Sequence, residues 1–510
     1  MEKETILLSG PSLKNDTIFY GAATLVERFI SFLIIPLLTK TLSQELYGVW
    51  TQIIVTSGLL LQIVLVGFHT AAVRFLSGAK NKQELSGIFH RMLAVVLLNS
   101  LIIIVFAFLF TPSLSKIMFA SLRFSKFIPL SGFFLVGEAL FELVSGFLRA
   151  RKEIRLLSIY YLLKNAGRIV ILAITILVFH LNLFWAIALI VAFQLFLTIF
   201  IYAKKILRKI GLVSFSLQNI RWKKIILFSL PLVPYGFLIW GNNFVDRYFI
   251  LHILSINDVS IYAVAYSLAA IGGIFYSILG FTLYPHLAKL WNDGDKIAAA
   301  EILRKVIKYY LFFVLPFIAV LTILSSPIIK IVSTAAYISN WQIIFWLSVG
   351  IGIFGFYQLN AYSILLANRT LLNLGVSAVA VVANVIFNIL LIPSMGILGA
   401  AIARFISNAV LAFWITKVGK KYLPYSFPLS TAVKMVLATV VISLFLVIVK
   451  YYISLDNCWR LIIAIVLAIV IYGSIDLLGK KSILLQLKKN LAPSPPSSPL
   501  GERKLGEGEL

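Results

Sequence analysis

Apolar runs of about 20 residues recur along the whole chain, and they constrain its fold more than any other feature of the sequence. A run of this length crosses the hydrocarbon core of a bilayer as one α-helix. Open sheets and irregular segments are excluded from lipid, because their backbone N–H and C=O groups would lack hydrogen-bond partners. Charged residues make up 13% of the chain, roughly half of their usual share in soluble domains. The sequence therefore predicts an all-α polytopic membrane protein.

Hydropathy divides the chain into about fourteen membrane-spanning helices. The predicted spans are residues 18–38, 47–68, 89–110, 127–148, 156–178, 183–203, 227–250, 260–284, 308–330, 341–365, 371–393, 396–416, 431–451 and 461–478. Of the 45 Lys and Arg residues, 33 fall on the side that both termini share and 7 on the other. Because basic residues concentrate in cytoplasmic loops, we expect both termini in the cytoplasm. The same rule accounts for the net charge of +26 without nucleic acid as a partner.

A weak internal repeat relates the two halves of the chain. Tyr47-Gly48-Val49 opens the second predicted span, and Tyr262-Ala263-Val264 opens the eighth, 215 positions later. Glu27-Arg28-Phe29 in the first span is echoed by Asp246-Arg247-Tyr248 in the seventh. Six spans are an even number, so the two halves would have the same orientation, a common plan in transporters that bind substrate between their repeats. The sequence thus predicts two six-helix lobes followed by two added C-terminal helices.

The predicted boundaries divide the chain into four parts. Residues 1–215 form the N-terminal lobe, 216–420 the C-terminal lobe, 421–482 the last two helices and 483–510 a cytoplasmic tail. The end of the tail is rich in Pro, Ser and Gly, and we expect it to be disordered. The loop 285–307 is predicted to form a short amphipathic helix at the membrane surface. Pro231 and Pro234 predict a weakened first half of the seventh span.

Nine charged residues fall inside the predicted spans, where an ionised side chain is costly unless it faces water, an opposite charge or a ligand. The cations are Arg28, Lys164, Arg168, Arg247 and Arg404. Lys164 and Arg168 are four residues apart, on one face of a helix. The first four of these cations are predicted to line a cationic chamber for a phosphate or pyrophosphate head group, with helix-to-helix ion pairs as the alternative. For Arg404, a position facing the cytoplasm or the lipid stays open.

The acids inside the predicted spans are Glu27, Glu138, Glu142 and Asp246. Glu138 and Glu142 share one helix face, and they are candidates for binding the proton or cation that drives transport, with a structural role as the alternative. Glu27 and Asp246 are expected chiefly to balance the charge of adjacent or facing arginines, with ion coupling as the alternative. One cysteine and five scattered histidines predict no metal site.

Sequence motifs of ATP-driven pumps and of hydrolases are missing from the chain. It has no Gly-rich phosphate-binding loop followed by Lys-Ser or Lys-Thr, so we do not expect ATP to drive transport within this chain. It also has no HExxH or GxSxG motif. We therefore predict a protein that is not an enzyme and that has no catalytic residues and no cofactor.

Four stretches carry a resemblance to a known family. They are residues 27–50 (ERFISFLIIPLLTKTLSQELYGVW), 147–159 (FLRARKEIRLLSI), 228–269 (FSLPLVPYGFLIWGNNFVDRYFILHILSINDVSIYAVAYSLA) and 384–407 (NVIFNILLIPSMGILGAAIARFIS). They resemble the corresponding stretches of bacterial polysaccharide transporters, the Wzx-type oligosaccharide-lipid flippases. The resemblance covers nearly the whole chain except the tail. The superfamily is shared with multidrug/cation exporters and the lipid II flippase.

The resemblance implies two six-helix lobes in a V, often with two extra C-terminal helices. It implies that an undecaprenyl-pyrophosphate-linked oligosaccharide is flipped to the outer leaflet of the bacterial inner membrane by alternating access, for surface polysaccharide biosynthesis. The family's cationic cavity carries over to Arg28 and Arg247, and less directly to Lys164 and Arg168. Coupling to H⁺ or Na⁺, and partnership with a glycan polymerase and other polysaccharide-assembly proteins, are further implications.

Two other functions stay open at this point. A multidrug or cation exporter of the same superfamily is disfavoured, because intramembrane cations suit an anionic substrate. A membrane glycan polymerase or ligase would usually carry catalytic groups on a substantial outer loop. The longest predicted outer loop, around residues 111–126, is too short to hold a folded domain.

Overall fold

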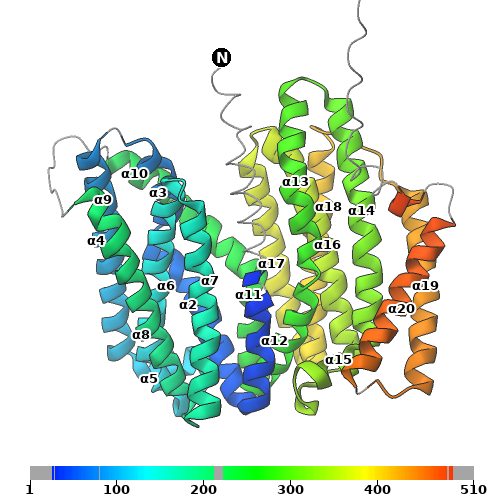
Figure 1. The fold of residues 1–510 in the computed structure, drawn as a ribbon, viewed down its shortest axis with the longest axis horizontal. Coiled ribbons are helices and arrows are strands. Elements are labelled where there is room, and N and C mark those ends of the chain that lie inside the picture. Colours follow the sequence, from blue (N-terminus) through cyan, green and yellow to red (C-terminus); the bar gives the residue numbers. More distant parts are fainter. Residues whose placement is uncertain are drawn as a thin grey trace, which may run out of the picture.

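The fold is known from a computed structural model that describes residues 26–485, except residues 28, 80, 212–221, 456 and 479–481. Nearly all of these residues are helical, and no strand occurs among them. Within this part of the chain, 13 helices are long and apolar enough to cross a membrane, and the shorter apolar helix Phe29–Thr41 lies at the predicted first span. The predicted all-α polytopic fold is therefore confirmed (Figure 1). The predicted tail lies outside the described residues from residue 486 onward.

Short connections join most of the helices. The helices that precede residues 212–221 are α2 (Gln44–Leu65), α3 (Phe68–Ser77), α4 (Lys82–Leu109), α5 (Thr111–Phe119), α6 (Phe127–Ala150), α7 (Ile154–Ala173), α8 (Leu183–Ile201) and α9 (Arg208–Ile210). The helices that follow are α10 (Trp222–Ser229), α11 (Leu232–Ile253), α12 (Ile256–Ala270), α13 (Gly273–Asn292), α14 (Lys296–Ile323), α15 (Ser325–Val332), α16 (Trp341–Leu366), α17 (Thr370–Met395), α18 (Ile397–Gly419), α19 (Leu429–Tyr452) and α20 (Cys458–Leu477). The π-helical turns η3 (Ile174–Val178) and η4 (Tyr202–Leu207) continue α7 and α8, and the 3-10 turns η2 (Leu122–Phe124) and η5 (Ala335–Tyr337) lie in connections.

The helices form two bundles side by side (Figure 1). We call residues 29–210 the N-bundle and residues 232–419 the C-bundle. Figure 1 shows α19 and α20 at the outer edge of the C-bundle. α19 packs against α14, and α20 packs against α19 and α15. The two bundles approach each other at the lower end of Figure 1, where α2 packs against α11 and α12. The lobe boundaries at residues 215 and 420 stay predictions.

The seventh span passes from one bundle to the other. Its first part, α10, packs against α3, where the Arg74 guanidinium lies 4.5 Å from the centroid of the Phe228 ring. The chain then breaks at Leu230 and Pro231, before α11 packs against α17 of the C-bundle. Proline cannot donate a backbone hydrogen bond, which is why a break occurs here. Where the sequence predicted a weakened helix, the structure has a break that divides the span into α10, next to the N-bundle, and α11 in the C-bundle.

A second break faces the first. α2 ends at Leu65, and the chain passes through Val66 and Gly67 with φ angles of 49° and 73° before α3 begins. A Cβ atom on Gly67 would lie 2.7 Å from the carbonyl oxygen of Ser229, so both the backbone angle and the close approach require glycine. The α2–α3 break of the N-bundle thus lies against the α10–α11 break of the seventh span.

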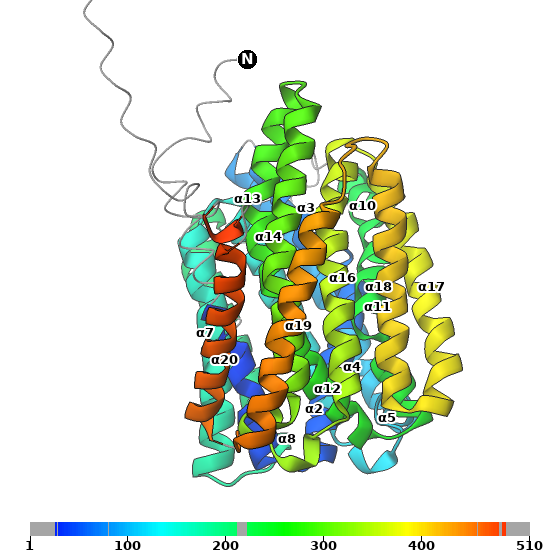
Figure 2. The same ribbon diagram turned by 90° about the vertical axis from the view of Figure 1, so that its right-hand side faces the viewer.

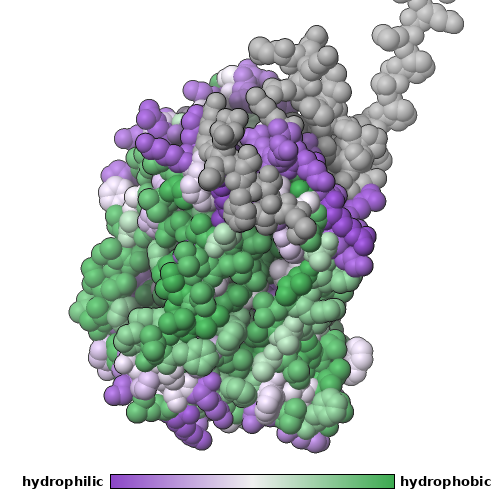
Figure 3. Space-filling view, turned by 90° about the vertical axis from the view of Figure 1, so that its left-hand side faces the viewer, coloured by the Kyte–Doolittle hydropathy of each residue, from purple (hydrophilic) through white to green (hydrophobic). Residues whose placement is uncertain are grey.

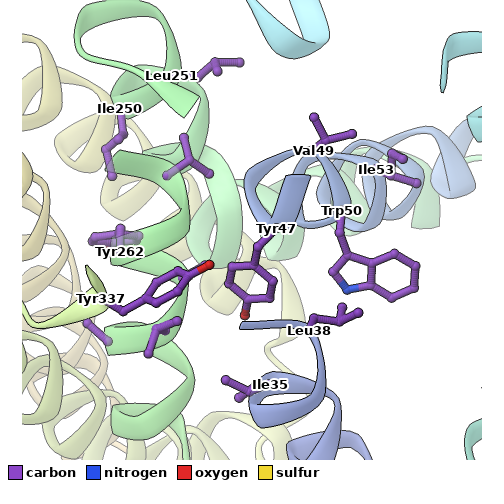
Figure 4. Close-up of a cluster of buried hydrophobic side chains, with 14 of the residues drawn as sticks. Ile35, Leu38, Tyr47, Val49, Trp50, Ile53, Ile250, Leu251, Tyr262 and Tyr337 are labelled. Carbon is purple, nitrogen blue, oxygen red and sulfur yellow. The ribbon is translucent and has the colours of Figure 1, made fainter. Parts of the chain in front are cut away.

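Buried side chains from both bundles form one core at the lower end. Ile35, Tyr47 and Trp50 of the N-bundle belong to the same cluster as Ile250 and Tyr262 of the C-bundle (Figure 4). The rings of Tyr47 and Tyr337 meet edge to face, with their centroids 5.8 Å apart. Fully buried aromatic side chains contribute more to such contacts than any other residue type. This core holds the two bundles together at one end.

Side chains also hydrogen-bond to backbone carbonyls across this interface. Lys40 Nζ donates to the Ile331 carbonyl at 2.6 Å, and Gln44 Nε2 donates to the Ala336 carbonyl at 2.5 Å. Farther along α2, the Thr56 and Tyr248 hydroxyls are 2.6 Å apart, and Trp240 Nε1 donates to the Val55 carbonyl at 2.8 Å. The contacts between α2 and the C-bundle therefore extend from the lower end toward the middle of the span.

The surface between the two ends of the molecule is apolar. Figure 3 shows a broad hydrophobic band between hydrophilic ends. On α19 and α20, large apolar side chains point outward, such as Leu437 with 61% of its surface exposed and Val470 with 56%. Such a band matches the hydrocarbon core of a bilayer. The molecule is thus a multi-pass membrane protein.

The predicted surface helix at 285–307 is wrong. α13 continues to Asn292, and α14 begins at Lys296, so the segment forms the ends of two long helices. A tight turn joins them, with Gly294 at a φ of 81° and Asp295 Oδ1 capping α14 by accepting from the Ala298 N–H at 2.9 Å. The two helices pack against each other, and their joined ends project beyond the neighbouring helices (Figure 2).

Gly48 tests whether the lower core holds the bundles together. A Cβ atom on Gly48 would lie 2.5 Å from the Ile256 carbonyl oxygen, so Gly48→Leu should disfavour the joined arrangement by about 1–3 kcal/mol, roughly five- to 150-fold. The measurement is disulfide cross-linking of Gln44→Cys with Ala336→Cys after replacing the exposed Cys458 by Ser. Gly375→Leu is the matched control, because its Cβ would meet nothing within 4 Å. Equal cross-linking in both variants would contradict this view of the interface.

Candidate functional site

Two polar clusters lie inside the membrane-spanning helices of the described chain, one in each bundle. The N-bundle cluster consists of Glu138 on α6 with Lys164 and Arg168 on α7. The C-bundle cluster consists of Asp246 on α11, Tyr262 on α12, Asn388 on α17 and Arg404 on α18. These clusters contain most of the charges that the sequence analysis selected, and they differ in how well the charges are balanced.

The N-bundle cluster pairs one carboxylate with two cations. Lys164 Nζ and Arg168 Nη2 each donate to a different oxygen of Glu138, both at 2.6 Å. The Lys164 ammonium also lies 4.0 Å from the centroid of the Phe141 ring. The predicted common face of Lys164 and Arg168 is what lets both reach Glu138. The cluster keeps one net positive charge, and Arg168 Nε is buried without a hydrogen-bond partner.

Glu27 lies next to this cluster. Asn165 Nδ2 on α7 donates to Glu27 Oε1 at 2.9 Å, so the start of the first apolar helix is attached to α7. Arg28 lies outside the described residues, so its predicted role in binding stays a prediction. Asn165 directly follows Lys164, so this end of the first apolar helix lies close to the N-bundle cluster.

Glu142 lies one turn along α6 from Glu138 and has different partners. The Tyr161 hydroxyl lies 3.1 and 3.3 Å from its two oxygens, and Arg149 Nη2 is 3.5 Å from Oε2. The Glu142 side chain keeps 22% of its surface exposed. Glu138 and Glu142 share a helix face as predicted, yet only Glu138 is tightly paired with cations.

The C-bundle cluster surrounds a fully buried carboxylate. Asp246 Oδ2 accepts from Arg404 Nε and from the Tyr262 hydroxyl, both at 2.7 Å, and Oδ1 accepts from Asn388 Nδ2 at 3.1 Å. Arg404 also donates to the backbone carbonyls of Asn242 and Asn243. These contacts join α11, α12, α17 and α18. Asp246 does balance an arginine, but that arginine is Arg404 and not its chain neighbour Arg247.

Arg247 is buried, and it makes no ion pair with any residue that the structure describes. Only 5% of its surface is exposed, and its Nε has no hydrogen-bond partner among the described residues. Its guanidinium lies 4.9 Å from the centroid of the Tyr266 ring and 5.1 Å from that of Phe244. Cation–π contacts of this kind lower the cost of burying a cation but leave its N–H donors unpaired. An anion placed beside Arg247 would compensate both the charge and the donors.

Arg247 also lies where the two bundles meet. The hydroxyl of Tyr248, the next residue, lies 2.6 Å from the Thr56 hydroxyl of α2. No hydrogen bond or ion pair joins the N-bundle cluster to the C-bundle cluster in the part of the chain that the structure describes. The predicted cationic chamber stays a prediction.

Metal binding is not indicated by the arrangement of side chains. Among the described residues there is no group of three or more His, Cys, Asp and Glu side chains that could hold a metal ion. The role of Arg404 was the main functional feature that the sequence analysis missed. Its signal lies in stretch 384–407, where Asn384, Asn388 and Arg404 interrupt a mainly apolar sequence.

Comparison with known sequences places the chain among polysaccharide biosynthesis proteins. The family described as "Polysaccharide biosynthesis protein" matches residues 13–291, more than half of the chain. The uncharacterized membrane protein MJ1068 of Methanocaldococcus jannaschii is 31% identical over 189 residues, 36% of each chain. The capsular polysaccharide biosynthesis protein CapF of Staphylococcus aureus is 25% identical over 195 residues, 37% of this chain and 48% of CapF. These alignments span less than half the length of either relative.

Comparison with solved structures identifies the fold. Lipid II flippase MurJ in an inward closed conformation has a TM-score of 0.73, with 17% identity over 90% of this chain and 98% of MurJ. An inward-facing multidrug resistance MATE transporter of the MOP superfamily has a TM-score of 0.62, with 14% identity over 80% of this chain and 94% of that chain. A MOP superfamily transporter from Pyrococcus furiosus has a TM-score of 0.56, with 14% identity over 81% and 94%.

The resemblance that the sequence motifs indicated is confirmed by these matches. At identities of 14–17% the structural likeness establishes the fold and leaves the substrate open. The match over residues 13–291 goes further, because it covers the whole N-bundle, the break in the seventh span, α12 and all but the last residue of α13. This chain belongs to the polysaccharide biosynthesis protein family and has the fold of the MOP superfamily.

Proposed function

We propose that this protein is a flippase that moves an undecaprenyl-pyrophosphate-linked oligosaccharide across the bacterial inner membrane by alternating access, for surface polysaccharide biosynthesis. Its family supports the link to polysaccharides, and its fold is shared with a protein that is named as a lipid II flippase. The observation that carries the proposal is Arg247, a buried cation near the meeting of the two bundles that has no anionic partner within the described part of the chain. Such a residue suits a substrate with a strong, compact negative charge.

The pyrophosphate is the part of this substrate that Arg247 would bind. Inside a membrane, an ionised side chain is retained where it pairs with an opposite charge or lines a substrate path. Arg404, the other buried arginine of the C-bundle, already has such a partner in Asp246, whereas Arg247 has none among the described residues. A guanidinium can hold two phosphate oxygens at once. Arg247 is therefore the substrate-binding residue that we favour most.

The N-bundle cluster offers a second positive site for the same head group. Lys164 and Arg168 share one carboxylate, so the cluster remains positive by one charge. The predicted role of Arg28 in binding the head group is kept in this proposal on sequence grounds alone. Two positive sites in two bundles suit a substrate that changes its contacts as the bundles move. A cationic drug would be repelled by both sites, which disfavours the exporter function.

Alternating access would use the way in which the bundles are joined. They share a core at the lower end of Figure 1, and the α10–α11 break connects them higher up. We propose that the upper end faces the cytoplasm, because most basic residues lie there, so that both termini are cytoplasmic. The head group would enter between the bundles while the prenyl chain stays in lipid. Opening of the lower core would then release the head group on the outer side.

A reconstituted assay tests the proposal directly. Purified protein in liposomes is expected to translocate a labelled polyprenyl-pyrophosphate oligosaccharide, measured as the fraction that becomes accessible to a membrane-impermeant reagent. Liposomes that contain Arg404→Ala protein, whose C-bundle should be disrupted, control for leakage caused by the protein itself. Export of organic cations in place of the lipid would favour the exporter, and elongation of the glycan would favour a polymerase or ligase. Either result would overturn the proposed function.

A further inference from the structure

Two neighbouring helices of the C-bundle carry matching rows of side chains. Both rows have one member every four residues, on one helix face, and together they consist of Tyr276, Gly280 and Tyr284 on α13 and Phe354, Gln358 and Tyr362 on α16. The rows meet where α13 packs against α16. The ring centroids of Tyr276 and Phe354 are 5.9 Å apart, and those of Tyr284 and Tyr362 are 5.4 Å apart. We call these six residues the aromatic-amide face.

Glycines fix the positions of two of these rings. A Cβ atom on Gly280 would lie 2.6 Å from the Tyr362 hydroxyl oxygen, so this side chain lies directly against the backbone of α13. A Cβ atom on Gly355 would lie 2.8 Å from the Tyr276 ring, so that side chain lies against the backbone of α16. Rings held in this way lose little further freedom when a ligand binds to them.

Gln358 is the polar side chain between the two ring pairs. It lies within the membrane-spanning helix α16 and is partly exposed, and its amide forms no hydrogen bond with any described residue. The hydroxyls of Tyr284 and Tyr362 form none either in the described part of the chain. On another face of α16, by contrast, the Asn360 amide oxygen accepts from the Tyr425 hydroxyl at 2.7 Å. An unpaired amide inside a span is costly unless water or a ligand bonds to it.

The aromatic-amide face is turned toward the N-bundle. α14 covers the other side of the α13–α16 pair, where the Tyr310 hydroxyl donates to the Gly352 carbonyl at 2.6 Å. In Figure 1, α14 lies on the side of α13 that is away from the N-bundle. Figure 2 shows α13 and α17 on either side of α16, and the Tyr357 hydroxyl of α16 donates to Asn373 Oδ1 of α17 at 2.9 Å.

The same span connects this face to Arg247. Tyr266 on α12 lies 4.9 Å from the Arg247 guanidinium, measured to the ring centroid. α12 leads into α13, and Tyr276 follows ten residues after Tyr266, an advance of roughly 15 Å at the helical rise. From there α13 continues to the upper end of Figure 1. A ligand that reaches from Arg247 toward the upper end of the molecule therefore passes the aromatic-amide face.

We propose that the aromatic-amide face binds sugar residues of the lipid-linked oligosaccharide. This inference rests on the proposed function and adds to it a place for the glycan. A sugar ring presents C–H groups on its faces, which are attracted to the negative face of an aromatic ring. Its hydroxyls donate and accept hydrogen bonds, and both an amide and a phenol can return them. With the pyrophosphate at Arg247, the glycan extends along α13 and α16.

A comparison of two lipids tests the glycan site. The full chain in lipid nanodiscs is titrated with undecaprenyl-pyrophosphate oligosaccharides extracted from its source cells, and with undecaprenyl pyrophosphate alone. The wild type should bind the sugar-bearing lipid roughly tenfold more tightly. Gln358→Leu, which replaces an unpaired amide by an apolar side chain of similar volume, should lose about three- to tenfold of this affinity and none for the sugar-free lipid.

The ring at Tyr362 gives a second, independent variant. Tyr362→Leu should also lose affinity only for the sugar-bearing lipid, whereas Tyr362→Phe keeps the ring and should retain most of it. Tyr451→Leu is the matched control, because this tyrosine is 82% exposed at the end of α19 and should affect neither lipid. Equal losses for both lipids would show a general structural role of the aromatic-amide face and overturn the inference.

The remaining outcomes separate this inference from the proposed function. If the wild type translocates the lipid but Gln358→Leu and Tyr362→Leu bind both lipids as the wild type does, the glycan site is wrong and the function stands. A wild type that binds both lipids equally tightly overturns the glycan site as well. If the preference for the sugar-bearing lipid is present and is lost in both variants, but the wild type translocates nothing, the proposed function fails and the glycan site stands. Absence of binding to either lipid overturns both.

Discussion

Replacement of Arg404 by alanine is expected to destabilise the protein by about 3–5 kcal/mol, because it leaves the carboxylate of Asp246 charged and unpaired inside the C-bundle. Asp246 is fully buried and the Arg404 side chain is 4% exposed, so solvent cannot replace the lost partner. The carbonyls of Asn242 and Asn243 would lose a donor at the same time. The measurement is the thermal unfolding midpoint of purified protein in detergent.

A double variant distinguishes the cost of leaving one charge unpaired from the cost of removing both charges. Asp246→Asn with Arg404→Leu removes both charges, and it should recover most of the stability that Arg404→Ala loses. Arg123→Ala is the matched control, because its pair with Glu45 is 72% and 40% exposed and should contribute no more than about 1 kcal/mol. A double variant as unstable as Arg404→Ala would show that the hydrogen bonds of Arg404 to the backbone matter more than its charge.

The number and order of the helices could be predicted because the hydropathy of each span is sufficient to identify it. A run of about 20 apolar residues predicts a membrane-spanning helix by itself, whatever the rest of the chain does. The 13 long apolar helices of the described chain correspond to the second to fourteenth predicted spans. The prediction of a surface helix at 285–307 was wrong because the same kind of local pattern does not show what the helix packs against. Its amphipathic pattern indicates one apolar face but not whether that face meets lipid or the paired helix.

The pairing of the buried charges could not be predicted from the sequence. Asp246 and Arg404 are 158 residues apart, and their contact depends on the rotation of α11 and α18 about their own axes. The same holds for Glu138 with Lys164 and Arg168, where the sequence shows the shared face of each helix and not the partner. The break at Gly67 was missed too, since an isolated glycine in an apolar run gives no signal for a change of direction.

These pairings change which arginine the function depends on. By sequence, Asp246 is expected to balance adjacent or facing arginines, and a position of Arg404 facing the cytoplasm or the lipid stays open. In the structure Arg404 pairs with the carboxylate and donates to two backbone carbonyls, and Arg247 has no ion-pair partner among the residues that the structure describes. Arg404 therefore maintains the C-bundle, and Arg247 is available for a ligand. The two arginines should respond to mutation in opposite ways.

Replacement of Arg247 by methionine is expected to abolish most translocation while leaving the unfolding midpoint unchanged or higher. A buried cation without an anionic partner costs stability, so its removal should not destabilise the C-bundle. Charge-assisted hydrogen bonds to a pyrophosphate contribute about 1.5–3 kcal/mol, so the affinity for the lipid-linked oligosaccharide should fall roughly ten- to 150-fold. Arg247→Lys should fall between the two, because lysine keeps the charge but loses the paired donors.

Binding and stability have to be measured on the same preparations. The exposed Arg151→Ala is the matched control, and it should change neither the unfolding midpoint nor the affinity for a polyprenyl-pyrophosphate oligosaccharide. A large fall in the unfolding midpoint of Arg247→Met would show that Arg247 has a structural role. Unchanged affinity with unchanged stability would remove Arg247 from the binding site, and the N-bundle cluster would then be the remaining place for the pyrophosphate. Loss of affinity at full stability, opposite to the behaviour of Arg404→Ala, is the result that this arrangement of charges requires.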